Sequence, residues 1–177
     1  PDVWELPYDK ISYKYTALTG NISLAFHPDD SWKVATIAST GFHAPNIDDT
    51  GKLFYKGSIL TIPNFNLEPE YARTLELNIT KNLNNRLLFN VNTYYTFIED
   101  AIMRVNTNLD FQINQDEFFT EAKTNENTGN AEIYGTTASA SLRIASNYTL
   151  ETDYTIIEGR NIDNDLPFTH IPPSFGK

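Results

Sequence analysis

The fold is decided by the stretch Trp32-Lys-Val-Ala-Thr-Ile-Ala-Ser-Thr-Gly-Phe-His-Ala-Pro-Asn46. Residues 32–38 alternate between apolar and polar side chains, which is typical of a β-strand. The alternation stops at Gly41 and Phe42, and Pro45 cannot continue a ladder because it has no backbone N–H to donate. More than twenty residues without periodicity follow. A simple hairpin would not need such a stop, so the stretch predicts a strand that ends at the rim of a sheet and opens into a long loop.

The same period of two recurs along the chain. In residues 86–98, apolar side chains at odd positions alternate with polar ones such as Asn90 and Asn92. Patterns of this kind predict six strands, at residues 21–27, 32–38, 72–80, 86–98, 133–144 and 148–156. Apart from a possible helical turn at residues 46–49, the sequence predicts no helix.

The connections between these strands alternate strictly in length. Residues 28–31, 82–85 and 145–147 are short polar turns, whereas residues 42–69 and 100–131 form links of up to about thirty residues. Several strands have roughly the ten residues that a tilted strand needs to cross a bilayer. The expected fold is all-β: an antiparallel meander of about six long strands, a segment of a transmembrane β-barrel, with long loops at one end and short turns at the other.

Alternation alone does not separate a barrel from a soluble sandwich. In a barrel the polar face lines the lumen; in a sandwich it meets water, and the apolar face is buried in a shared core. Exposure of Phe89, Val91 and Leu150 therefore distinguishes the two folds. The side chains predicted to face the lumen are Glu76, Asn78, Asn90, Asn92, Glu151 and Asp153, and those near strand ends, as interfacial aromatics would be, are Trp32, Tyr94, Tyr95, Phe97 and Tyr148.

Composition limits the classes of partner. The 177 residues carry a formal net charge of −10 with only 13 Lys and Arg, so a nucleic-acid interface is not expected, and cationic or small ligands are better electrostatic partners. With no cysteine, the chain has no disulfide, thiolate zinc site or cysteine nucleophile. No apolar run approaches the roughly 20 residues of a spanning helix, so a membrane role could only be through strands.

Five ordered segments resemble one family. Ser39-Thr-Gly-Phe-His-Ala-Pro-Asn46 resembles the Gly-Phe-Arg-Ala-Pro segment of TonB-dependent outer-membrane receptors, the plugged barrels that import iron chelates, haem, cobalamin and some glycans. Asn66-Leu-Glu-Pro-Glu-Tyr71, Tyr94-Tyr-Thr-Phe-Ile-Glu-Asp-Ala-Ile102, Asn127-Thr-Gly-Asn-Ala-Glu-Ile-Tyr-Gly135 and Leu166-Pro-Phe-Thr-His-Ile-Pro-Pro173 are similar to later segments of the same barrel. The resemblance gives structural roles to Gly41, Phe42, Ala44, Pro45, Leu67, Pro69, Glu70, Pro172 and Pro173.

The resemblance also implies what lies outside the chain. Plugged barrels of this sort use 22 strands, so six strands cannot enclose a plug. Residues 1–177 are therefore expected to be a partial barrel domain from the C-terminal part of an outer-membrane receptor, without its plug domain. The implied partners of the parent are a small nutrient such as a metal chelate, the plug, TonB and membrane lipid. The isolated chain is expected to self-associate because its apolar face and sheet edges would be exposed.

Candidate ligand-binding residues lie in the long loops. They are His43, Asn46, Tyr55, Phe65 and Asn66, and His43 stands where the family commonly has Arg. No cofactor, resident metal or catalytic residue is predicted. Glu68 and Glu70 flank Pro69 and are interpreted as strand-entry structure rather than as a glycosidase pair. The alternatives are a soluble extracellular β-sandwich that binds glycans through aromatics such as Tyr55 and, as a third class, a β-rich glycosidase.

Overall fold

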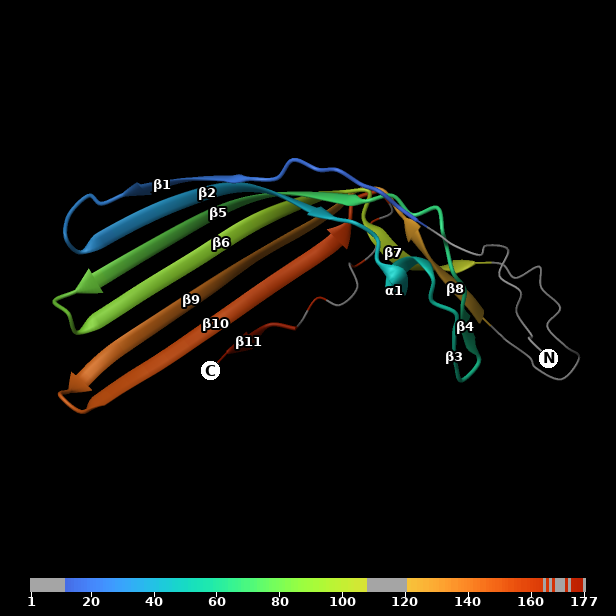
Figure 1. Cartoon of the computed structure of the whole chain (residues 1–177). Coiled ribbons are helices and arrows are strands. Elements are labelled where there is room, and N and C mark those ends of the chain that lie inside the picture. Colours follow the sequence, from blue (N-terminus) through green and yellow to red (C-terminus); the bar gives the residue numbers. More distant parts are fainter. Residues whose placement is uncertain are drawn as a thin grey trace, which may run out of the picture.

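Seven antiparallel strands form one long curved sheet (Figure 1). The computed structural model describes residues 12–107, 121–163, 165, 167, 171 and 173–176. In spatial order the strands are β1 (Asn21–Phe26), β2 (Trp32–His43), β5 (Glu70–Leu83), β6 (Leu87–Glu99), β9 (Ala131–Ala145), β10 (Tyr148–Asn161) and β11 (Phe175–Gly176). All six predicted strands are confirmed as an antiparallel meander, and β11 adds a short pairing at the edge.

Strand β2 is longer than its alternation predicted. Its ladder with β5 continues past Ala38 and ends where His43 pairs with Glu70. The strand therefore ends one residue beyond the predicted end at Gly41 and Phe42, because backbone pairing with β5 carries it past the last alternating residue. Pro45 is buried two residues after the strand. Its missing N–H therefore falls where the ladder has already ended.

The short connections are tight turns, as predicted. Between β5 and β6, Asn84 and Asn85 have φ of 53° and 54°, and the Arg86 N–H donates to the Leu83 carbonyl at 3.0 Å. This is the two-residue type I′ geometry that suits the twist of a hairpin. Between β1 and β2, hydrogen bonds from Ser31 to the Asp29 carboxylate lower the pKa of Asp29.

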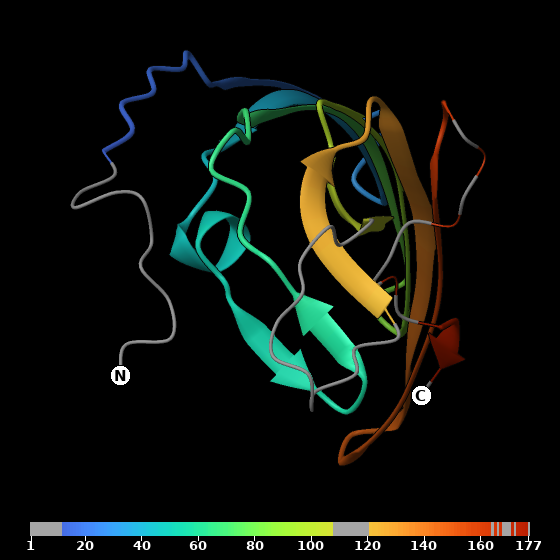
Figure 2. The ribbon, with the colours of Figure 1, turned by 90° about the vertical axis from the view of Figure 1, so that its right-hand side faces the viewer.

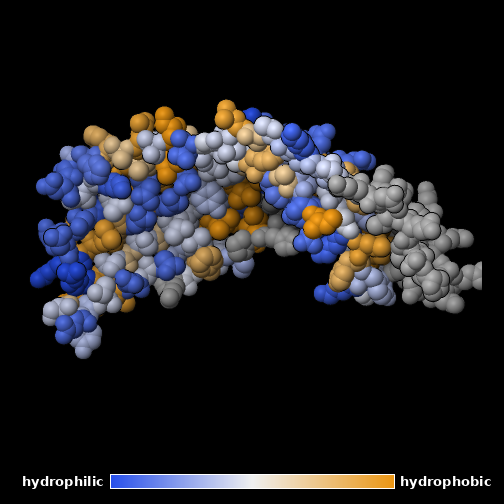
Figure 3. All heavy atoms as spheres, viewed as in Figure 1, coloured by the Kyte–Doolittle hydropathy of each residue, from blue (hydrophilic) through white to orange (hydrophobic). Residues whose placement is uncertain are grey.

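One face of the main sheet is apolar and exposed. Phe89, Val91 and Leu150 are 43%, 38% and 57% exposed, so no second sheet packs on this face among the described residues. Figure 3 shows hydrophobic side chains along the upper side of the molecule, over β1 and β2. An apolar face that points outward is the arrangement of a membrane barrel, and the β-sandwich interpretation is therefore wrong.

The opposite face is polar and internally hydrogen-bonded. The side-chain amides of Asn78 and Asn90 bond each other at 3.3 and 3.4 Å, and Asn90 also donates to Thr80 at 2.9 Å. A ladder of this kind satisfies polar side chains in a lumen. Tyr94 lies on this face directly opposite Gly135. Its prediction as an outward interfacial aromatic is wrong, because register places it in the lumen row.

Gly135 gives a test of this packing. A Cβ built on it would lie 2.9 Å from the Ile156 carbonyl oxygen and 2.9 Å from the Tyr94 ring. We expect Gly135→Ala to lower the free energy of unfolding by ~1–3 kcal/mol, because the backbone contact cannot relax freely. Urea unfolding of the receptor in lipid vesicles measures this change. Ser139→Ala, on the same strand and face, is the matched control and should have a much smaller effect.

Polar and aromatic side chains border the outward apolar band at both ends. Towards the long loops, Tyr95 donates to Glu132 and Tyr134 donates to Glu158, both at 2.7 Å. At the short-turn end, the Lys81 ammonium lies 4.4 Å from the ring centre of Trp32. Such residues occupy membrane interfaces because they combine an apolar body with a polar tip. We therefore expect the two groups to lie at the two borders of the hydrocarbon layer.

The two long connections lie at one end of the main sheet, as predicted, and fold into a second sheet whose strands the alternation did not reveal. This loop sheet has the order β3 (Phe54–Lys56), β4 (Ile59–Thr61), β8 (Glu121–Asn127) and β7 (Ile102–Thr107), and α1 (Ile47–Thr50) precedes it. Strands of three residues are too short to reveal a period of two, and β4 pairs in parallel with β8, which is distant in sequence. In Figure 2 the loop sheet lies on the concave side of the main sheet. Within the described part of the chain, no helix is long and apolar enough to span a bilayer.

Candidate ligand-binding site

Helix α1 is fixed to the end of β2 by a capping box. The Asn46 side-chain oxygen accepts the N–H groups of Asp48 and Asp49 at 2.7 and 3.2 Å, and the Asp49 carboxylate accepts the Asn46 N–H at 2.9 Å. Reciprocal bonds of this kind satisfy the free N–H groups of a first helical turn. Asn46, predicted as a ligand contact, thus has a structural role in starting the helix.

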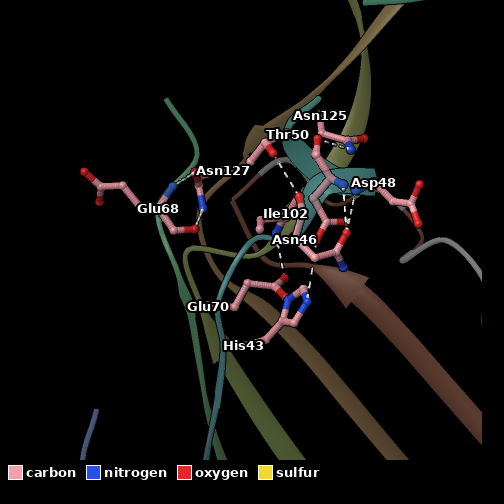
Figure 4. A network of polar contacts seen from close by, with 10 residues as sticks. His43, Asn46, Asp48, Thr50, Glu68, Glu70, Ile102, Asn125 and Asn127 are labelled. Carbon is pink, nitrogen blue, oxygen red and sulfur yellow. Dashed lines mark hydrogen bonds and ion pairs between the residues drawn. The ribbon is translucent and has the colours of Figure 1, made fainter. Parts of the chain in front are cut away.

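Glu70 joins three segments at the rim (Figure 4). One carboxylate oxygen contacts His43 Nδ1 at 2.6 Å, and the other accepts the Ile102 N–H at 2.7 Å. The remaining nitrogen of His43, Nε2, lies 3.6 Å from the Asp49 carboxylate. His43 therefore faces two carboxylates from the position where the family commonly has Arg. The end of β2, the start of β5 and the start of β7 are held together here.

Asn127 joins the two long connections a second time. Its side-chain oxygen accepts the Glu68 N–H at 2.8 Å, and its NH₂ group donates to the carbonyls of Glu68 and Asp100 at 2.9 and 2.7 Å. Asn125, two residues earlier, donates to the Asp49 carbonyl at 2.9 Å. These bonds and the β4–β8 pairing bind the connections into one unit attached to the rim.

The main apolar core lies under this unit rather than within the long sheet. The buried apolar side chains of the described residues are Leu60, Leu67, Ala101, Met103, Ala122 and Ala131. Asn161, the last residue of β10, is fully buried beside them and donates to the Thr128 carbonyl and hydroxyl at 3.1 and 2.9 Å. Sequence reasoning missed Asn161, because nothing in the local pattern predicts that an Asn at the end of a strand is buried.

A pocket of about 420 Å³ lies between α1 and the β7–β8 pair. Its lining contains Asp48, Asp49, Lys52, Ile102, Arg104, Lys123 and Asn125. Sequence reasoning missed its three cations, because they are spread over two connections that only the loop sheet brings together. In the described residues, no three His, Asp or Glu side chains are arranged to hold a metal ion.

The predicted loop residues are divided between structural and exposed positions. His43 and Asn46 lie together in the rim network. Tyr55 is exposed on β3, the Phe65 carbonyl accepts the Tyr13 hydroxyl at 2.6 Å, and the exposed Asn66 has its N–H bonded to the Asn64 side chain at 3.0 Å. None of these contacts tests whether the five residues bind a ligand, which stays a prediction.

The residues given structural roles by resemblance lie mainly at the rim. The rings of Phe42 and Tyr71 are 5.3 Å apart, Gly41 pairs with Ala72, and Leu67 is 3% exposed. Ala44 and Pro69 are half-buried, and Pro173 is exposed. Pro172 and His170 lie outside the described residues.

Solved structures share this fold. The copper transporter OprC matches with a TM-score of 0.71 and 16% identity, covering 89% of this chain and 23% of OprC. A double mutant of the Serratia marcescens hemophore receptor HasR, in complex with its hemophore HasA and heme, matches at 0.70 and 16%, covering 88% and 28%. The FrpB iron transporter from Neisseria meningitidis matches at 0.54 and 15%, covering 86% and 21%.

This chain spans about a quarter of the length of these structures. No curated protein sequence matches it. The family model described as TonB dependent receptor-like, beta-barrel, matches residues 3–177. The chain therefore belongs to the TonB-dependent receptor β-barrel family, whose members are outer-membrane transporters rather than enzymes.

Proposed function

We propose that this chain is part of an outer-membrane receptor for TonB-dependent uptake of a scarce nutrient, and that its loop sheet helps to capture the nutrient outside the cell. The observation that carries the proposal is the joining of both long connections into one sheet on the concave side of the barrel strands. Loops held on a rigid scaffold are the usual place for binding residues. His43, Tyr55, Phe65 and Asn66 are retained as candidate contacts, with Asn46 positioning α1.

The nutrient is proposed to be a small metal chelate or a metal-containing compound. The names of the similar structures mention copper, iron and heme, and these support the class without identifying a member. The proposed partners in the parent are a plug domain, TonB and membrane lipid. The chain by itself is proposed to self-associate, because Leu75 and Leu77 are 59% and 37% exposed on its apolar face.

Growth experiments with the intact receptor test this function. We expect a strain that depends on the receptor to grow on one of a panel of sole nutrient sources: ferric chelates, haem, a copper chelate, cobalamin and glycans. Growth should be lost when either the receptor or TonB is deleted, and should return with the receptor on a plasmid. The proposal would be contradicted if growth on every nutrient of the panel were unchanged by deletion of the receptor and by deletion of TonB.

A further inference from the structure

Cationic side chains gather in the pocket between α1 and the β7–β8 pair. The chain has only 13 Lys and Arg against 23 Asp and Glu, yet Lys52, Arg104 and Lys123 line this one pocket. They come from the segment after α1, from β7 and from β8. The overall charge favours cationic partners, whereas the pocket has three cations and two carboxylates, Asp48 and Asp49.

The strand register places two of the cations on one face. Arg104 pairs with Asn125, and Lys123 pairs with Asn106, two residues further along the ladder. Alternate residues of a strand share a face, so Arg104 and Lys123 lie on the same side of the pair. Met103 and Ala122, at the intervening positions, are 7% and 5% exposed. The cationic side therefore faces away from the apolar core.

The cations have little compensation from the protein. Within residues 12–107 and 121–163, neither Arg104 nor Lys52 forms an ion pair, although Lys52 lies 5.5 Å from the Phe54 ring centre. Lys123 has a partly exposed pair with Glu121 at 3.6 Å, and such pairs are weak. The three cationic side chains are therefore available to a bound anion.

The carboxylates of the pocket are not equivalent. Asp49 already accepts the Asn46 N–H at 2.9 Å and faces His43 Nε2 at 3.6 Å. Asp48 is exposed at the edge of α1, and its N–H, not its carboxylate, takes part in the cap. The negative charge of Asp49 is thus turned towards the rim network, which leaves the wall formed by β7 and β8 positive.

We propose that this pocket binds the carboxylate groups of an anionic ligand, namely a polycarboxylate or a metal chelate that carries free carboxylates. Arg104 offers a planar fork that can hold a carboxylate through two hydrogen bonds, and Lys52 and Lys123 add positive charge at either side. The volume of about 420 Å³ is that of a small-molecule site. This inference rests on the proposed function, since it names the chemical class that the loop sheet selects.

Citrate is the probe for the test, used with the intact receptor purified in detergent at low ionic strength. Calorimetry should detect citrate binding by the wild type, and acetate, with one carboxylate, should bind far more weakly. We expect Arg104→Ala and Lys123→Ala each to weaken citrate binding roughly tenfold, the effect of losing one charge-assisted contact. Lys56→Ala, on exposed β3 and outside the pocket lining, is the matched control and should bind as the wild type does.

Two results would overturn the proposal. One is the absence of citrate binding by a wild-type receptor that has the circular dichroism spectrum of a folded barrel. The other is an equal loss in Lys56→Ala and Arg104→Ala, which would show attraction to net charge alone. The growth panel is read separately. If the receptor binds citrate but growth does not depend on TonB, the uptake function is refuted and the anion site stands. If growth depends on TonB but citrate does not bind, the uptake function stands and the anion site is refuted.

Discussion

Val91→Arg is expected to lower the free energy of unfolding of the intact receptor by about 2–4 kcal/mol, the cost of an Arg facing lipid near the middle of a barrel wall. Val91 lies on the outward face of β6, with Ile79 of β5 and Ala138 of β9 beside it. The guanidinium would have to enter hydrocarbon or bend towards the interface. Urea titration of the receptor refolded in lipid vesicles gives the change directly.

The control for this substitution is its neighbour in sequence. Asn92→Arg introduces the same side chain on the same strand, but on the polar face, where Asn92 lies opposite Asn78. We expect the loss to be well under half of that in Val91→Arg, because a polar lumen hydrates the added charge. Equal losses in the two variants would contradict the assignment of the outward face to lipid.

Glu70→Ala is expected to loosen the start of β7 where it is held at the rim. The substitution removes the acceptor of the Ile102 N–H and the partner of His43, contacts at 2.7 and 2.6 Å. Hydrogen bonds to charged groups contribute about 1.5–3 kcal/mol, so the amide of Ile102 should exchange with solvent roughly 10- to 100-fold faster. Hydrogen–deuterium exchange by mass spectrometry, resolved to the peptide that contains β7, measures this opening.

Two further variants serve as controls for the Glu70→Ala experiment. Glu68→Ala removes a nearby exposed carboxylate that points away from the network in Figure 4, and exchange in β7 should be unchanged. Glu70→Gln keeps an oxygen that can accept the Ile102 N–H, so it should restore much of the protection. If Glu68→Ala and Glu70→Ala accelerate exchange equally, the effect belongs to surface charge and not to the contacts of Glu70.

The barrel strands could be predicted because their local pattern carries the fold. Each long strand has one face for lipid and one for a polar lumen, so alternation is visible over ten or more residues, as in β6. Alternation did not distinguish barrel from sandwich, since both fold classes need a strand with two different faces. In β2 the alternation also stops before the strand does, because Gly41, Phe42 and His43 remain paired with β5 without alternating.

The loop unit was largely beyond sequence reasoning. The helical turn at α1 was expected from residues 46–49, but β3 and β4 have three residues each, and their pattern is too short to read. The contact that organises them is long-range, since β4 pairs with β8 across the whole β5–β6 hairpin. Arg104 and Lys123 share a face through the β7–β8 register, and Lys52 joins them only where the first long connection folds against that pair, so no local signal connected Arg104 with Lys52.

The parallel pairing of β4 with β8 also sets an order of assembly. Closing a chain segment as long as the one between Ile59 and Glu121 costs conformational entropy before the contact returns any stability. Formation of the β5–β6 hairpin removes most of that cost by bringing the two ends to one rim. The loop sheet should therefore fold after the wall strands have paired. A receptor still being inserted would then have no finished surface with which to hold its nutrient.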